Sequence, residues 1–249
     1  MTKAYKDPDF MMGLEARPLR ILAEYLEPRQ RLGEHQVRRS IIFFGSARIR
    51  PKAPDAVDAS VDYYNEARAL AARLARWTTD SHEQADRYFI CTGGGPGIME
   101  AANRGAADEN RSLSMGYNIS LPHEQGSNDY ISEALNFEFH YFFMRKFWFM
   151  YNSHGLVIFP GGFGTMDELF EVLTLIQTGK QAPIPVVLFG GHFWRRLIDF
   201  DLFVEMGLIS PEDVRLFRIV DTVDEAFEYL KTSLESEHFD HSQTEFPKA

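Results

Sequence analysis

The amino-acid sequence predicts an α/β protein built on a Rossmann-like, doubly wound parallel sheet. Short apolar runs, such as residues 41–44 and 156–159, are typical of strands that are covered on both faces of a parallel sheet. Segments whose apolar residues recur with helical spacing lie between such runs. Strands that alternate with helices favour a single doubly wound domain, and several of these strands run directly into glycine-rich turns.

Seven segments are predicted to be strands because they are short, largely apolar and bounded by turn residues. These strands lie at residues 41–44, 88–91, 114–119, 137–140, 156–159, 185–189 and 218–220. The periodic segments between and after them are predicted to be helices. These helices lie at residues 56–77, 98–110 and 142–152, after residue 165, from residue 193, and at residues 223–230.

Residues 1–39 precede the first strand and are predicted to form a helical extension. Leu19, Leu22 and Leu26 have helical spacing, and Pro28 is expected to end this helix. The six arginines of the extension make it locally basic. These arginines are expected to form a solvent-exposed charged face. The alternative is that some of them contribute to an anion-binding pocket or to a subunit contact.

The rest of the chain is predicted to be one domain, residues 40–232, followed by a polar, disordered tail, residues 233–249. The net charge of −10 argues against a general nucleic-acid-binding surface. Cys91 is the single cysteine, so a reducing cytoplasm is the expected setting. No apolar run reaches the roughly 18 residues that cross a bilayer, and the polar first residues are not expected to be a signal peptide.

A glycine-rich turn at residues 160–165 joins a predicted strand to a predicted helix. Glycines let the backbone approach a ligand, and the first N–H groups of a helix lack partners in that helix, so such a turn suits phosphate. Asp167 and Glu168 are expected in the first helical turn. Their charges could simply stabilise the helix N-terminus, or Glu168 could take part in chemistry beside the phosphate. Asp167 is expected to cap the helix or contact another subunit.

Four glycine-containing turns are expected at one edge of the sheet, because the carboxyl ends of parallel strands lie together. They are residues 45–46, 92–97, 160–165 and 190–191. Since so many glycine turns exceed what the fold alone requires, we expect a nucleotide-sized pocket at this edge.

Familiar cofactor and metal motifs fail in this chain. The turn at residues 93–97 is followed by Ile98, where the dinucleotide pattern needs a third glycine, and the next predicted strand has no carboxylate. The Gly-Lys pair at residues 179–180 lacks a preceding phosphate-binding loop, and the eight histidines have no zinc-type spacing. No metal is therefore expected. Among the residues that could bind a metal or a cofactor, Met99 and Met115 are expected in the core. His154 and His192 are expected in turns or at the surface.

Three sequence blocks resemble those of the LOG (Lonely Guy) family. Residues 91–106 contain the run GGGPGIMEAANRGA, and residues 160–168 match the family's PGGxGTxxE signature. Residues 145–146 fit its Arg-Lys element, and residues 44–48 are similar to its first strand turn. The resemblance extends over residues 40–220, and the N-terminal extension is similar to that of the longer bacterial subgroup.

The resemblance implies a nucleoside 5′-monophosphate phosphoribohydrolase, which cleaves the N-glycosidic bond to release a free base and ribose 5-phosphate. The implied substrates are AMP, a cytokinin riboside monophosphate, or both, and no cofactor is implied. A homodimer or an assembly of dimers is implied as well. Such proteins have also been labelled lysine decarboxylases, but neither Lys146 nor Lys180 is singled out as a lysine that binds pyridoxal phosphate. A non-catalytic nucleotide sensor and a transferase on the same fold are the alternatives.

By this resemblance Arg145 and Glu168 are the catalytic pair. Arg145 lies in an aromatic-rich helix, where an unpaired charge is costly, so it should pair with Glu168, with the phosphate or with both. A purely structural ion pair is the alternative. Residues 142–144 depart from the Met-His-x run of the short enzymes, which leaves base specificity open. The expected substrate-binding residues are Gly45, Ser46, Gly93, Gly94, Gly95, Lys146, Gly161, Gly162, Gly164 and Thr165.

Overall fold

The structure, a computed structural model, describes residues 2–52, 61–120 and 126–236, and they form one seven-stranded sheet. Every neighbouring pair of strands is parallel, in the order β4-β3-β2-β1-β5-β6-β7. This confirms the predicted α/β class and the doubly wound parallel sheet. The strands are β1 (Arg39–Phe44), β2 (Tyr88–Thr92), β3 (Ser114–Ile119), β4 (Asn136–Phe139), β5 (Ser153–Ile158), β6 (Val186–Phe189) and β7 (Arg218–Val220).

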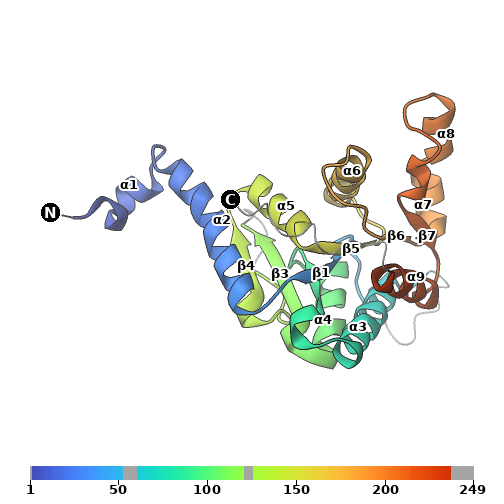
Figure 1. Cartoon of the computed structure of the whole chain (residues 1–249), viewed down its shortest axis with the longest axis horizontal. Helices are drawn as coiled ribbons and strands as arrows, with labels where there is room; N and C mark the ends of the chain where they lie inside the picture. The colour runs from blue at the N-terminus through green and yellow to red at the C-terminus, as the bar shows by residue number, and fades with distance from the viewer. Residues whose placement is uncertain (1, 53–60, 121–125, 237–249) are drawn as a thin grey trace.

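Helices cover both faces of the sheet. Figure 1 shows α3, α4 and α9 along one face, α5 and α6 on the other, and α2 beside the β4 edge with α1 projecting beyond it. The helices are α1 (Pro8–Met12), α2 (Arg17–Glu34), α3 (Tyr63–Ser81), α4 (Ile98–Asn110), α5 (Phe142–Tyr151), α6 (Phe163–Gln177), α7 (Gly191–Leu197), α8 (Phe200–Glu205) and α9 (Val223–Glu235).

The winding of the sheet reverses between β1 and β5. The chain leaves β1 toward α3 on one face and leaves β5 toward α6 on the other (Figure 1). The two strands pair in parallel, with Ile42 opposite Leu156 and Phe44 opposite Ile158. In open α/β sheets a ligand binds in the crevice outside the carboxyl ends of the strands at such a reversal.

The core is formed where the helices pack on β1, β2 and β5. Ile41, Ile42 and Phe43 are all completely buried. On one face α3 and α4 approach closely because Gly105 has no side chain, since a Cβ at that position would lie 2.1 Å from the backbone oxygen of Arg68. This packing fixes the helices that follow β1 and β2, and thereby the turns that begin them.

Pro28 does not end the N-terminal helix as predicted, because α2 continues through it to Glu34. A proline lacks the N–H that would bond to the carbonyl four residues earlier, which is that of Glu24. Here the indole Nε1 of Trp148 donates to the Glu24 carbonyl at 2.8 Å. The missing helical bond is thus replaced by a bond from α5, and the Glu24 carboxylate also accepts from the backbone N–H of Tyr141 at the start of α5.

Other helix boundaries differ from the prediction as well, most of all those of α3 and α9. The helix α3 begins at Tyr63, because the Asp62 carboxylate caps it by accepting from the backbone N–H of Asn65, and residues 53–60 lie outside the described part. The helix α9 continues to Glu235, so the start of the predicted tail is helical: Leu234 is buried, and Trp77 Nε1 donates to the Glu235 carboxylate at 3.1 Å. Residues 237–249 lie outside the described part. The short helix α8 was not predicted.

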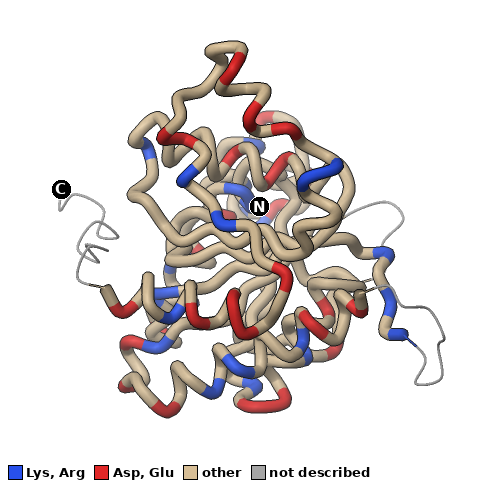
Figure 2. The backbone as a smooth tube through the Cα atoms, turned by 90° about the vertical axis from the view of Figure 1, so that its right-hand side faces the viewer, with Lys and Arg blue, Asp and Glu red and all other residues tan. Residues whose placement is uncertain are grey.

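Charges of both signs are interspersed over the molecule. Figure 2 shows acidic and basic residues interspersed over the described part, and the full sequence has 36 Asp and Glu against 26 Lys and Arg. Among the helices of residues 2–52, 61–120 and 126–236, none combines the length and the apolar character that a membrane span requires.

Candidate active site

A pocket of about 960 Å³ opens at the carboxyl edge of the sheet, around the reversal between β1 and β5. This volume suits a nucleotide-sized ligand. The pocket brings together residues from the ends of β1, β2, β3 and β5 and from the starts of α5 and α6. The predicted site residues that line it are Gly45, Ser46, Gly93, Gly95, Arg145, Gly162, Gly164, Thr165 and Glu168.

Three predicted residues and one predicted turn do not line the pocket. Gly94 is buried behind it, and Gly161 is covered by Thr165, whose Oγ1 would lie 2.1 Å from a Cβ at that glycine. Lys146 points to a different group of acids. The turn at residues 190–191 packs instead on Tyr63, whose hydroxyl would lie 2.7 Å from a Cβ at Gly190.

The turn between β5 and α6 presents backbone N–H groups to the pocket. Gly162 is the N-cap of α6, so the N–H groups of residues 163–165 have no acceptor within the helix. Gly162, Phe163 and Gly164 are exposed. The turn is tied to the end of β1, because the backbone N–H of Ser46 donates to the Pro160 carbonyl at 3.0 Å. This arrangement is suited to an anion such as phosphate.

Asp167 and Glu168 do not lie in the first turn of α6, which begins at Phe163 and has no acid there. The prediction that their charges stabilise the helix N-terminus is therefore wrong, and Asp167 does not cap the helix. Asp167 is exposed and contacts Lys146. Glu168 is one turn further into the helix, lines the pocket, and its side chain is only 6% exposed.

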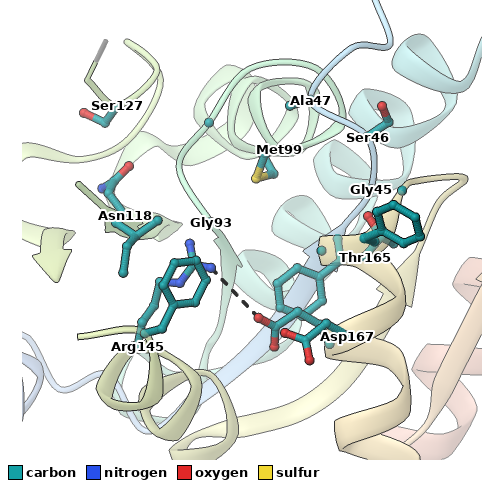
Figure 3. A pocket seen from close by; sticks show the side chains of 18 of the residues that line it. Gly45, Ser46, Ala47, Gly93, Met99, Asn118, Ser127, Arg145, Thr165 and Asp167 are labelled. Carbon is teal, nitrogen blue, oxygen red and sulfur yellow. Dashed lines mark ion pairs between the residues drawn. The ribbon is translucent and has the colours of Figure 1, made fainter. Parts of the chain in front are cut away.

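Arg145 faces Glu168 across the pocket floor from α5. Its Nη2 lies 4.0 Å from Glu168 Oε1, and the dashed line in Figure 3 marks this ion pair. The guanidinium Cζ lies 4.8 Å from the centre of the Phe142 ring and 5.6 Å from that of Phe149. Cation–π contacts with both rings stabilise the charge in its apolar helix and fix its orientation toward the pocket.

Burial changes the acidity of Glu168. The loss of solvent around its carboxyl is the largest effect, and it raises the pKa of Glu168 from an ordinary 4.5 to about 7. Lys146 and Arg145 act against this increase, whereas Glu171 and Asp167 add to it. A carboxylate with a pKa near neutrality can accept and return a proton at physiological pH.

The buried carboxyl of Glu168 is expected to make the protein less stable as the pH rises. Its pKa is higher in the folded chain (about 7) than its ordinary value of 4.5, so the free energy of unfolding falls between these pH values, by at most about 3 kcal/mol. Unfolding by guanidinium chloride can be measured from about pH 4 to about pH 8, a range that includes both pKa values. The free energy of unfolding should decline over this range in the wild type and change less in Glu168→Gln. Equal slopes in the two proteins would contradict the assignment.

Lys146 forms ion pairs with acids of α6 and does not line the pocket. Its Nζ lies 2.9 Å from Asp167 Oδ2 and 2.8 Å from Glu171 Oε2, and the lysine side chain is 18% exposed. These two acids flank Glu168 on the same helix. Lys146 therefore fastens α5 to α6 and supplies positive charge close to Glu168 without lining the pocket.

Replacing Lys146 with glutamine is expected to raise the pKa of Glu168 further, because two acids would then face Glu168 without their cation. The carboxyl resonance of Glu168, assigned by comparison with Glu168→Gln, can be followed by NMR as the pH changes. Lys146→Arg keeps the charge and should leave the titration close to that of the wild type. A titration that is unchanged in Lys146→Gln would exclude this electrostatic role.

A buried polar network supports the turn after β2. Thr92 Oγ1 donates to Asn103 Oδ1 at 2.6 Å, and the backbone N–H of Gly94 donates to Thr92 Oγ1 at 2.9 Å. Asn103 is fully buried, and its Nδ2 donates to the Met115 carbonyl at 3.0 Å. Asn103 thus links the turn to α4 and β3, and gives residues 93–95 one fixed conformation.

Replacing Asn103 with alanine is expected to lower the free energy of unfolding by about 2–3 kcal/mol, because buried partners would be left without hydrogen bonds. Chemical denaturation measures this loss. Asn65→Ala is a matched control, since Asn65 is exposed on α3 and, among the described residues, its side chain bonds only to Asp62. A loss in Asn103→Ala no larger than that in the control would contradict the role of the network.

Sequence reasoning missed several residues that line the pocket. Met99, predicted to be in the core, lies at the pocket, whereas Met115 is buried as predicted. His154 is buried rather than at the surface, and its Nδ1 lies 3.0 Å from the Asn152 carbonyl. Arg48, Asn118 and Glu138 are among the other lining residues that sequence reasoning missed. Their position at the carboxyl edge of the predicted strands could have signalled all three.

Neither a metal site nor a pyridoxal phosphate site is supported by the residues at the pocket. Within the described ranges no three His, Cys, Asp or Glu side chains gather as metal ligands would. No lysine is among the described lining residues, and the Nζ of Lys146 is held by two carboxylates outside the pocket. Lys180 is exposed after α6. The residues present thus do not fit pyridoxal phosphate bound through a lysine.

Comparison with known proteins agrees with this geometry. The model of a family described as "Possible lysine decarboxylase" matches residues 99–230. A protein of Oryza sativa subsp. japonica, named "Probable cytokinin riboside 5′-monophosphate phosphoribohydrolase", is 34% identical over 80 residues, which are 32% of this chain and 38% of that protein. The "Pyrimidine/purine nucleotide 5′-monophosphate nucleosidase" of Escherichia coli K12 is 29% identical over 162 residues, 58% of this chain and 34% of that one.

The chain therefore spans less than two fifths of the length of these two relatives. Among solved structures, the "molybdenum cofactor binding protein" of Rippkaea orientalis superposes with a TM-score of 0.50 at 18% identity. The superposition covers 79% of this chain and 98% of that protein. At this identity the similarity shows a shared fold alone.

Proposed function

We propose that this chain, which belongs to the family described as "Possible lysine decarboxylase", hydrolyses nucleoside 5′-monophosphates to a free base and ribose 5-phosphate. The observation that carries the proposal is the position of Glu168. Its buried carboxylate lines a nucleotide-sized pocket beside Arg145, next to a helix N-terminus suited to phosphate. The names of the rice and Escherichia coli relatives support the same reaction.

In this proposal the turn at residues 162–165 binds the phosphate. Contacts remote from the reacting bond then position the ribose over the pocket floor. Breaking the glycosidic bond develops positive charge on the sugar, which the Glu168 carboxylate stabilises. Glu168 also takes a proton from the attacking water as the new C1′–O bond forms. The departing base leaves with the electron pair of the broken bond and receives the proton that Glu168 returns, which restores the carboxylate.

Arg145 keeps Glu168 in its reactive state. Its positive charge favours the ionised carboxylate, and its orientation by the Phe142 and Phe149 rings keeps it toward the pocket. The Arg145 side chain is 14% exposed, so little water screens its interaction with Glu168. Because the pKa of Glu168 is about 7, hydrolysis should increase as the pH rises through neutrality.

The direct test is incubation of the purified protein with AMP, CMP, IMP, UMP and isopentenyladenosine monophosphate. Chromatography would follow the free base, and a coupled assay would follow ribose 5-phosphate in equal amounts. Release of both products from at least one nucleotide is the expected result. Binding of a nucleotide without release of a base would overturn the hydrolase assignment and favour a nucleotide sensor.

Residues 39–235, from the start of β1 to the end of α9, form the catalytic domain in this proposal, and the protein acts in the cytoplasm as a homodimer or an assembly of dimers. Exposed aromatic side chains near the pocket support self-association, since Phe163 is 95% exposed and Phe143 is 51% exposed. The single cysteine, Cys91, is a buried free thiol, in agreement with a reducing setting. Light scattering coupled to gel filtration would reveal a monomer if the proposal of an oligomer is wrong.

A further inference from the structure

The order of the strands arranges the pocket as a row of subsites. From one end to the other, the pocket is lined by residues at the carboxyl end of β3 (Asn118), β2 (Gly93), β1 (Ser46) and β5 (Gly162). Neighbouring strands lie about 4.8 Å apart, so Asn118 and the turn after β5 are separated by roughly 14 Å, or three strand spacings. Figure 3 shows Arg145 and its ion pair between Asn118 on one side and Thr165 on the other.

A nucleoside monophosphate has the same order of parts: phosphate, ribose and base. If the phosphate binds the turn after β5 and the glycosidic bond lies at Glu168, the base must extend toward the end of β3. This step rests on the proposed function. It makes Asn118 the central polar residue of the part of the pocket that would contain the base.

The carboxamide of Asn118 has a fixed orientation. Its Nδ2 donates to the backbone carbonyl of Phe137 at 2.8 Å and to Asn136 Oδ1 at 2.6 Å, both on β4. A backbone carbonyl can only accept, so the nitrogen must face β4 and the oxygen must face the opposite side. Asn136 is held in turn, because its Nδ2 donates to Ser127 Oγ at 2.7 Å.

The oxygen of this carboxamide faces the turn after β2. A Cβ at Gly94 would lie only 1.7 Å from Asn118 Oδ1, so Gly94 leaves the space that the oxygen occupies. Figure 3 shows the oxygen on the side of Gly93 and the nitrogen turned away. Among the hydrogen bonds between described residues, none ends on this oxygen, so one acceptor remains available to a ligand in the pocket.

Of the other polar side chains that line this end, Ser120, Ser127, Asn136 and Glu138, the charged one is also an acceptor. Glu138 lines the pocket, and its Oε1 accepts from the hydroxyl of Ser120 at 2.6 Å. A base that binds here meets a carboxamide oxygen and a carboxylate. A hydrogen-bond donor on the edge of the base is favoured by both, whereas a carbonyl oxygen is repelled by both.

We infer that Asn118 is a specificity-determining residue that selects bases carrying an exocyclic amino group over bases carrying an oxo group at the same position. Adenine and cytosine nucleotides are then favoured over their deaminated counterparts, IMP and UMP. The pairs AMP with IMP and CMP with UMP differ in this exocyclic group and in the adjoining ring nitrogen, which is an acceptor in the amino bases and carries a hydrogen in the oxo bases. The Asn118 variants are therefore needed to assign a preference to this residue. The preference arises from the acceptor oxygen that β4 fixes, not from pocket size.

The test compares AMP with IMP in hydrolysis by the wild-type protein and in binding, by calorimetry, to Glu168→Gln. In both measurements AMP should be favoured by at least about 10-fold, the cost of leaving a polar group unpaired. Asn118→Ala should bring the ratio close to one by weakening AMP while IMP changes little. Asn118→Asp retains an acceptor but loses the two bonds to β4 that orient it, so its preference for AMP should lie between those of the wild type and Asn118→Ala. Asn65→Ala, outside the pocket, should leave the ratio unchanged.

Each outcome has a distinct meaning. Equal handling of AMP and IMP, or an AMP preference that persists in Asn118→Ala, would overturn the role of Asn118 and leave the hydrolase proposal intact. Selective binding of AMP without release of adenine would support the role of Asn118 and overturn the hydrolase proposal. Failure of both nucleotides to bind would overturn both. Circular dichroism of each variant, with Asn118→Asp as the second variant, separates loss of folding from loss of selectivity.

Discussion

Replacing Glu168 with glutamine is expected to lower kcat for nucleotide hydrolysis by about 100- to 10,000-fold, the usual contribution of a positioned general base. Glutamine has nearly the same shape but can neither accept the proton of the attacking water nor balance the charge of the sugar. The turn proposed to bind phosphate precedes Glu168 and is unchanged by the substitution. KM should therefore stay within about 5-fold of the wild-type value, because binding and chemistry depend on different groups.

Steady-state kinetics with AMP at pH 8, about one unit above the pKa of Glu168, is the appropriate measurement. Glu205→Gln removes a carboxylate at the end of α8, outside the pocket, and serves as the control for the chemical change. If kcat falls by less than about 10-fold in Glu168→Gln, the loss of about 1.4 kcal/mol would be too small for a general base. The proton transfer would then be assigned to another group. A rise in KM with kcat unchanged would make Glu168 a binding residue instead.

The strand pattern could be predicted from the sequence because parallel strands buried on both faces leave a strong signal. The predicted strands 41–44 and 185–189 match the buried apolar parts of β1 and β6, and the predicted helix 98–110 coincides with α4. Burial on both faces requires a continuous apolar run, and the glycine turns mark where each run ends. The sheet edge that contains the pocket was predictable for the same reason.

What could not be predicted depends on contacts between distant segments. Pro28 remains within α2 because Trp148, 120 positions later in the chain, donates to the carbonyl that the proline leaves free. Lys146 adjoins Arg145 in sequence, yet the helix turns the two side chains in different directions, toward Asp167 and Glu171 in one case and toward the pocket in the other. Local sequence does not encode either partner.

The same limit applies to Asn118. Its place at the end of a predicted strand could be read from the sequence, but the direction of its carboxamide depends on β4, whose Phe137 carbonyl fixes the nitrogen. Gly94 was predicted to contact the substrate, and the structure gives it a different task. It is buried at a φ of +76° and leaves room for the Asn118 oxygen, so its effect on a ligand is indirect.

Replacing Arg145 with alanine is expected to lower kcat/KM by at least about 100-fold, because it removes the buried charge that favours ionised Glu168 and contacts the pocket. The pKa of Glu168 should rise above about 7, so the acidic limb of the pH–rate profile should move to higher pH. Arg145→Lys is expected to restore the charge but little of the activity. A lysine ammonium is a compact point charge and, unlike the guanidinium, has no planar surface to stack on the Phe142 and Phe149 rings.

The pair of variants separates a catalytic role of Arg145 from a structural one. An ion pair that only joins α5 to α6 would affect the free energy of unfolding, and Arg145→Lys would recover much of that stability together with full activity. A catalytic Arg145 predicts the opposite pattern, in which Arg145→Lys is folded and stable but remains slow. Unfolding curves and kcat/KM measured on the same preparations decide between them, since Arg145 at 14% exposure and Glu168 at 6% are buried enough for either role.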